Sequence, residues 1–133
     1  LSLTLLNCRR SEMKECQYRL KRIIKEFEVC HDALVAIGDE TRQLIIMTLL
    51  ESDCNGIRVG EITEKTHLSR PAVSHHLKIL KEAGMINMRR EGTKNYYYMD
   101  ANETQWGQIA QLVNHIYEVV KDFAPIDTRK GDD

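Results

Sequence analysis

The sequence predicts a mainly α-helical domain that carries one small β-hairpin. Two long stretches, one near each end of the chain, repeat apolar residues every three or four positions, which is the spacing of an amphipathic helix. Between them, residues 86–99 contain two β-favouring runs joined by a glycine turn. The 133 residues suffice for one domain with a modest core. We therefore expect a partner chain to help bury the apolar surface.

The first long stretch, residues 11–37, predicts a single amphipathic helix. No Pro or Gly interrupts it. Its apolar positions are Met13, Cys16, Leu20, Ile23, Phe27, Cys30, Leu34 and Ile37. At 1.5 Å per residue such a helix would be roughly 40 Å long, more than a domain of this size covers alone. Part of the stripe should therefore meet a second chain or another helix.

Short elements follow the long helix. Gly38 offers a stop, and Asp39 can cap a strongly apolar helix that continues to Glu51 and should be buried. A turn and a brief strand over residues 53–59 then lead to a helix at residues 60–66. These short elements occupy the sequence between the long helix and the next predicted N-cap, Ser69.

A new helix is predicted to begin at Ser69, a good N-cap residue, and to run to Ala83. Pro71 fits its first turn, and Gly84 is a C-terminal stop. The apolar stripe of this helix is Val73, Leu77 and Leu80. Polar residues lie outside that stripe: Arg70, Ser74, His75, Lys78 and Lys81. Two helices joined by a short turn predict a helix-turn-helix over residues 60–84.

A basic hairpin and a last helix complete the domain. Strands are predicted at residues 86–90 and 95–99, with Gly92 in the turn, and they form a wing over residues 86–99. The last helix is predicted over residues 102–124. Its apolar positions are Trp106, Ile109, Val113, Ile116, Val120 and Phe123. The order of elements is that of a winged helix-turn-helix.

The domain organisation follows from these elements. We expect an N-terminal arm at residues 1–10, one winged-helix domain at 11–124 and a polar tail at 125–133. The apolar seams of the two long helices, 11–37 and 102–124, suit a two-fold dimer interface. The candidate interface residues are Leu20, Ile23, Phe27, Leu34, Trp106, Ile109, Val113, Ile116, Val120 and Phe123.

The distribution of charge points to a nucleic-acid partner. The net charge is −1, yet residues 65–94 carry seven basic and two acidic side chains, a local +5 against −6 elsewhere. The residues suited to base edges are Ser69, Arg70, Ser74 and His75, with His76 as a further candidate. Those suited to phosphates are Lys78, Lys81, Arg89, Arg90 and Lys94. The alternative is a winged helix that binds proteins without specific DNA binding.

Three segments resemble the ArsR/SmtB family of bacterial repressors. They are AIGDETR at 36–42, LSRPAVSHHLKILKEAG at 68–84 and REGTKNYYY at 90–98, and the likeness covers roughly residues 30 to 100. The resemblance implies a DNA-binding homodimer built from the first and last helices. It also implies recognition by the second helix of the motif, wing contacts at 89–94, and a repressor released from double-stranded operator DNA by an inducer.

The two familiar metal sites of that family are incomplete in this chain. Where one type has Cys-x-Cys before the recognition helix, this sequence has Thr63 and Lys65. Where the other has Asp and His at the start of the last helix, it has Asn102 and Thr104. The two ligands left at that second site are His115 and Glu118. Two ligands do not complete a tetrahedral zinc site, so we predict no metal there and a structural pairing between these two side chains.

Adjacent residues on the recognition helix do not suggest catalysis or chelation. His75 and His76 point about 100° apart, so they would not hold one ion together, and His76, nearer the apolar stripe, should hydrogen-bond within the fold. Ser74 diverges from its neighbour in the same way, and no carboxylate is placed to orient the imidazole. We therefore expect no enzyme and no cofactor.

The four cysteines form no Cys-x-x-Cys pair. Cys16 and Cys30 lie on the seam of the long helix and should pack in the core. Cys54, in a turn, and Cys8, in the N-terminal arm, are the candidate sensors of a thiol-reactive or soft-metal inducer. The sequence shows neither a long apolar run nor a signal-peptide pattern, and we expect a cytoplasmic protein.

Overall fold

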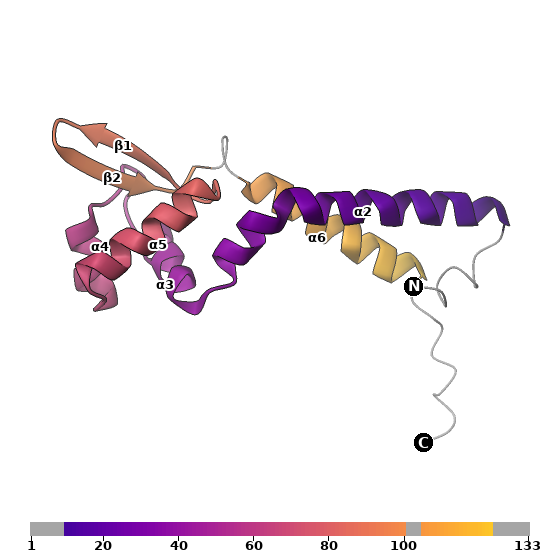
Figure 1. The fold of residues 1–133 in the computed structure, drawn as a ribbon, viewed down its shortest axis with the longest axis horizontal. Helices are drawn as coiled ribbons and strands as arrows, with labels where there is room; N and C mark the ends of the chain where they lie inside the picture. The colour runs from indigo at the N-terminus through magenta and orange to yellow at the C-terminus, as the bar shows by residue number, and fades with distance from the viewer. Residues whose placement is uncertain (1–9, 101–104, 124–133) are drawn as a thin grey trace, which may run out of the picture. The chain divides into compact units, whose positions relative to one another are not determined.

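A computed structural model describes residues 10–100 and 105–123 (Figure 1). The chain runs through α2 (Arg10–Ile37), α3 (Glu40–Leu50), α4 (Val59–Thr66), α5 (Arg70–Glu82), β1 (Asn87–Glu91), β2 (Lys94–Tyr98) and α6 (Trp106–Phe123). The predicted fold class, mainly α with a β-hairpin wing, is confirmed. Contacts divide the described chain into two units, residues 30–109 and residues 10–29 with 110–123.

The core of the unit at residues 30–109 forms where α3, α4 and α5 pack together. Ile45, Ile62 and Leu77 contribute fully buried side chains from these three helices. Two buried polar side chains, Thr48 and Thr66, donate hydrogen bonds to carbonyls one turn earlier in their own helices, at 2.9 and 2.6 Å. Their hydroxyls are thereby satisfied, and the core remains otherwise apolar.

Helix ends follow the predicted capping residues. Asp39 accepts a hydrogen bond from the backbone N–H of Arg42 (2.9 Å), which holds the pKa of that carboxyl below its usual value. Ser69 caps α5 by accepting from the N–H of Ala72 (3.2 Å). Gly84 follows α5 with φ of +77°, the left-handed conformation that a helix stop requires.

The hairpin is antiparallel, and its strands are shifted by one residue from the predicted bounds. Asn87 pairs with Tyr98 and Glu91 pairs with Lys94. Gly92 has φ of +62° and opens the two-residue turn, as a tight hairpin connection requires. The brief strand predicted after the 53–56 turn is reduced to an isolated bridge between Ile57 and Tyr97, because α4 already begins at Val59.

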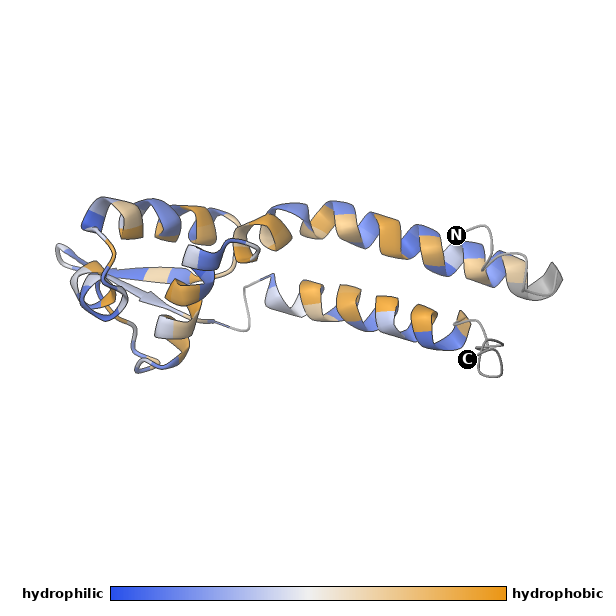
Figure 2. Ribbon diagram, turned by 90° about the horizontal axis from the view of Figure 1, so that it is seen from below, coloured by the Kyte–Doolittle hydropathy of each residue, from blue (hydrophilic) through white to orange (hydrophobic). Residues whose placement is uncertain are grey.

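In the other unit, the first part of α2 lies antiparallel to α6. Arg19 is ion-paired with Asp122 (3.1 Å), and Glu26 contacts His115 (2.7 Å). The buried apolar side chains of this unit include Cys16, Ile23 and Leu112. Figure 2 shows hydrophobic positions recurring turn after turn along α6. Within the described ranges, no helix is both long and apolar enough to span a membrane.

Candidate nucleic-acid interface

Helices α4 and α5, joined by residues 67–69, form the predicted helix-turn-helix. The stripe of Val73, Leu77 and Leu80 is fully buried, which turns the opposite side of α5 toward solvent. The residues predicted to point outward are all exposed: Arg70, Ser74, His75, Lys78 and Lys81. A face of this kind offers hydroxyl, imidazole and cationic groups together, which suits contacts with base edges and phosphates.

The N-terminus of α5 combines a cap with an exposed polar surface. Ser69 is exposed, and its hydroxyl oxygen accepts the hydrogen bond from Ala72 while the hydroxyl hydrogen can still donate. Pro71 occupies the first turn, where the missing N–H costs nothing. Because the N-terminal end of a helix is electropositive, this end of α5 favours a phosphate in front of it.

The two adjacent histidines of α5 have different surroundings. His75 is exposed beside Ser74. His76 is half-buried, and its Nδ1 lies 3.3 Å from a guanidinium nitrogen of Arg42. The prediction that His76 hydrogen-bonds within the fold is thus confirmed, and the structure places this side chain away from the fully exposed residues of α5.

The wing presents cations at its tip and holds another, Arg89, midway along β1. Arg90 and Lys94 are exposed on either side of the turn, and Arg90 Nε donates to the carbonyl of Gly92 (3.0 Å). Arg89 donates to the carbonyl of Asn55 and lies 4.8 Å from the centre of the Tyr96 ring. Its guanidinium therefore connects the wing to the 53–56 turn.

The folded protein keeps an excess of exposed positive charge over residues 65–94. The two acidic side chains of the segment pair locally, Lys78 with Glu82 at 4.0 Å and Arg89 with Glu91 at 3.1 Å. The five other cations of the segment are exposed: Lys65, Arg70, Lys81, Arg90 and Lys94. Exposed cations on α5 and the wing attract a polyanion at long range and release counterions when it binds.

The comparisons with known proteins identify this arrangement. The family model for the bacterial regulatory proteins of the arsR family matches residues 39–88, which contain the whole helix-turn-helix. A helix-turn-helix transcriptional regulator of Methanocaldococcus jannaschii is 33% identical over 93 residues, which are 70% of this chain and 100% of that protein. The chain belongs to the ArsR family of bacterial regulatory proteins.

Two further proteins extend the comparison. The transcriptional repressor SdpR of Bacillus subtilis is 39% identical over 70 residues, 53% of this chain and 74% of SdpR. The homodimeric winged helix-turn-helix DNA-binding domain of a Mycobacterium bovis protein shares the fold, with a TM-score of 0.50 and 20% identity over 77% of this chain and 90% of that one. The ArsR-family chain is therefore a DNA-binding transcriptional regulator, and the comparisons do not support a winged helix used only for protein interactions.

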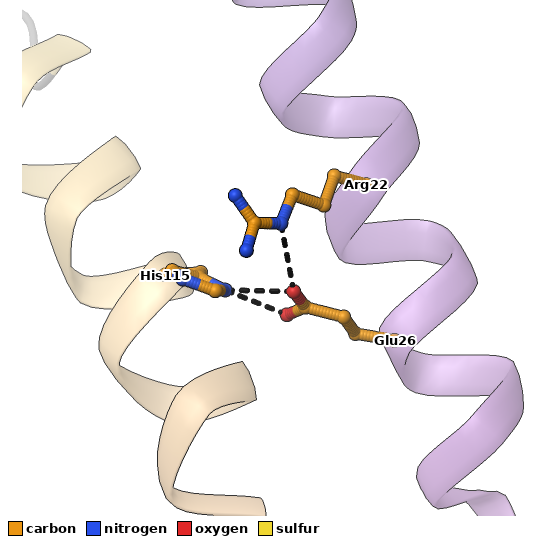
Figure 3. A network of polar contacts seen from close by, with 3 residues as sticks. All are labelled: Arg22, Glu26 and His115. Carbon is orange, nitrogen blue, oxygen red and sulfur yellow. Dashed lines mark hydrogen bonds and ion pairs between the residues drawn. The ribbon is translucent and has the colours of Figure 1, made fainter. Parts of the chain in front are cut away.

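Among the residues at the family's second metal position, the structure corrects one prediction. His115 Nδ1 contacts both carboxylate oxygens of Glu26, at 2.7 and 2.9 Å, and Glu26 also pairs with Arg22 at 3.3 Å (Figure 3). The predicted pairing of His115 with Glu118 is wrong, because the carboxylate that contacts the imidazole is that of Glu26 on α2. Residues 102 and 104, the other two positions of this site, lie outside the described part of the chain.

The thiols divide as predicted where the structure describes them. Cys16 and Cys30 are buried and Cys54 is exposed, whereas Cys8 lies outside the described residues. Asp53, next to Cys54, accepts a hydrogen bond from the Asn55 N–H (3.0 Å), which lowers the pKa of the Asp53 carboxyl. The Cys54 sulfur thus lies beside an ionised carboxylate, whereas reactive thiolates usually have electropositive neighbours.

Sequence reasoning missed Arg42 as a structural residue. Its guanidinium donates to the carbonyls of Ala36 (2.7 Å) and Val35 (3.4 Å) in the last turn of α2, besides contacting His76. A signal was present in the sequence, because α2 has no basic residue in its last turn and a cation follows soon after the Gly38 stop. Cations near the C-terminus of a helix interact favourably with its dipole.

Proposed function

We propose that this ArsR-family protein is a homodimeric repressor that binds an operator through α5 and the wing and leaves it when an inducer binds. The observation that carries the proposal is the exposed surface of α5, where Arg70, Ser74 and His75 all lie outside a fully buried apolar stripe. A basic wing follows the helix directly in the chain. No catalytic role is proposed for any residue of this face.

In the proposed complex, α5 enters the major groove of the operator. Its N-terminal half offers Arg70, Ser74 and His75 to base edges, and a guanidinium can contact both acceptors of a guanine. Lys78 and Lys81, further along the helix, and the wing tip with Arg90 and Lys94 would lie against the phosphates. In this arrangement the helix supplies sequence specificity and the wing supplies affinity.

The homodimer is supported by apolar side chains that a single chain leaves exposed. Ile24 and Phe27 on α2, and Val113, Tyr117 and Val120 on α6, belong to the same unit and are each about half exposed or more. Soluble monomers rarely expose many large apolar side chains together. Two copies joined through this unit would place two recognition helices on half-sites about one helical turn of DNA apart.

The proposal for the inducer rests on which side chains are already engaged within the fold and on which thiols are exposed. Because His115 is engaged by Glu26, we propose that zinc at stoichiometric levels neither binds tightly at His115 nor releases DNA. If the signal is thiol-reactive, Cys54 and Cys8 are its proposed targets, since Cys16 and Cys30 are buried. The carboxylate of Asp53 counts against fast reaction at Cys54. A regulator of this kind would act where the DNA lies, in the cytoplasm.

The test is binding of a labelled duplex that covers the promoter region of the protein's own gene, measured by anisotropy over a range of salt concentrations. Affinity should fall steeply as salt rises, because neutralised phosphates release counterions. Arg90→Ala or Lys94→Ala should weaken binding to specific and unrelated duplexes alike and flatten the log–log salt slope by about one. Lys14→Ala, which removes an exposed cation of α2, is the control and should change neither. An affinity that does not change with salt, or an equal loss of affinity in the Lys14→Ala control, would contradict the proposal.

A further inference from the structure

Arg42 joins three elements of the unit at residues 30–109. From α3, its Nε donates to the carbonyl of Ala36 at 2.7 Å and a terminal nitrogen donates to that of Val35 at 3.4 Å, both in the last turn of α2. Its other terminal nitrogen lies 3.3 Å from Nδ1 of His76, on the recognition helix α5. One side chain therefore connects the end of α2, the start of α3 and the middle of α5.

The end of α2 depends on side chains that follow it. The last carbonyls of a helix have no partner within the helix, and the last turn of α2 contains no basic residue. Arg42 donates to two of these carbonyls, of which that of Val35 also accepts the Gly38 N–H at 3.2 Å, and Gln43 donates to a third, that of Ile37, at 2.7 Å. The backbone N–H of Arg42 is held in turn by the Asp39 carboxylate. The guanidinium is thus fixed in place before it reaches α5.

The contact with α5 specifies the protonation state of His76. A guanidinium has only donors, so Nδ1 of His76 must accept, and the ring proton must be on Nε2. An imidazole protonated on both nitrogens would turn a donor toward Arg42 and place two cations 3.3 Å apart. The Asp39 carboxylate and the exposed His75 ring, whose centre is 5.5 Å from that of the His76 ring, lie near the same imidazole.

We propose that Arg42 is a positioning residue for the recognition helix, fixing α5 against the end of α2 through Nδ1 of a neutral His76. The inference rests on the proposed DNA-binding function and deepens it. His76 is half-buried and so supports the reading face rather than forming part of it. Loss of this contact loosens the support of α5 and weakens operator binding, with no change in the residues that touch DNA.

The experiment measures operator affinity by anisotropy at pH 8.0 for the full chain, for two matched variants of His76 and for Arg42→Gln. His76→Asn places an acceptor that does not protonate at the position of Nδ1, and His76→Gln moves the amide one carbon further out. At pH 8.0 the Asn variant should bind like the wild type, whereas the Gln variant and Arg42→Gln should each lose about tenfold, the worth of one charge-assisted hydrogen bond.

A second measurement does not depend on any variant. The nitrogen chemical shifts of His76 in the full chain at pH 8.0 should show the proton on Nε2. A proton on Nδ1, or an unchanged affinity in both His76→Gln and Arg42→Gln, would overturn the positioning role. Failure of the wild type to bind operator at pH 8.0 would instead reject the proposed function, and the nitrogen shifts would still report on the contact between Arg42 and His76.

Discussion

At the scale of single residues, three glycines distinguish the cost in stability of a left-handed backbone from the cost of a steric clash. Gly84 has φ of +77°, and a Cβ there would lie 2.9 Å from Cγ of Gln105. Gly92 has φ of +62° with open space around it, and Gly60 lies in α4, also with open space. Gly92→Ala should lower the free energy of unfolding by about 1 kcal/mol, because left-handed backbone is unfavourable for L-residues. Gly84→Ala should cost more, since Gln105 must also move.

Gly60→Ala is the matched control for this series, measured by urea denaturation. It should raise the free energy of unfolding by about 0.5 kcal/mol, because alanine loses less backbone entropy in a helix than glycine does. An equal loss of stability at Gly60 and Gly84 would show that the left-handed backbone and the Gln105 contact are irrelevant to the cost.

Individual residues were predictable where their role is local. The cap at Ser69 and the stop at Gly84 depend on neighbours within a few positions, and both are found as predicted. The partner of His115 was not predictable, because Glu26 is 89 positions away and the pairing depends on which helix lies opposite. The contact between Arg42 and His76, which are 34 positions apart, was not predictable for the same reason.

At the scale of elements, the cap of α5 offers a way to separate folding from DNA binding. Ser69→Ala removes the acceptor for the Ala72 N–H and should lower the free energy of unfolding by about 1 kcal/mol. Ser69→Asp keeps an equally good cap and should leave stability unchanged. Its carboxylate would nevertheless stand where the electropositive end of α5 meets phosphate, so operator affinity should fall about tenfold or more.

Denaturation and anisotropy on the same two variants test this separation. Equal losses of stability in both would mean that the aspartate carboxylate does not replace the Ser69 hydroxyl as the cap. Unchanged affinity in the Asp variant would mean that this end of α5 does not face the DNA backbone.

Element types were predicted correctly because periodicity and capping signals agree along most of the chain. The bounds of the β-strands moved by one residue, since strand ends depend on pairing rather than on composition. The brief strand around Ile57 became a single bridge to Tyr97 for a similar reason, because α4 starts too soon for the strand to continue. Local patterns therefore identify elements better than they locate the ends of paired strands.

At the scale of the whole molecule, the two apolar seams divide into a part used within the chain and a part left over. Ile23 and Ile109 of the predicted interface are buried in the single chain, whereas Phe27, Val113 and Val120 are 47%, 56% and 60% exposed. The sequence predicted both seams, but periodicity alone does not distinguish a face that packs within the chain from one that meets a partner. That distinction requires the position of the neighbouring helix.

The exposed part of α6 supplies the test of assembly. Val113, Tyr117 and Val120 are spaced four and three residues apart and so share one side of the helix. The wild type should sediment at about twice the chain mass of 15.4 kDa at micromolar concentration. Val113→Lys, a charge placed on this side, should shift the species toward a single chain while the helical signal is retained, because the residue is already exposed in one chain.

Gln111→Lys is the control, since it adds the same charge to an exposed polar position of the same helix. It should sediment like the wild type and bind operator with similar affinity, whereas Val113→Lys should bind far more weakly because two linked recognition helices bind cooperatively. A wild type that sediments as one chain would contradict the dimer. Equal behaviour of the two variants would move the interface away from this side of α6 without affecting the reading face of α5.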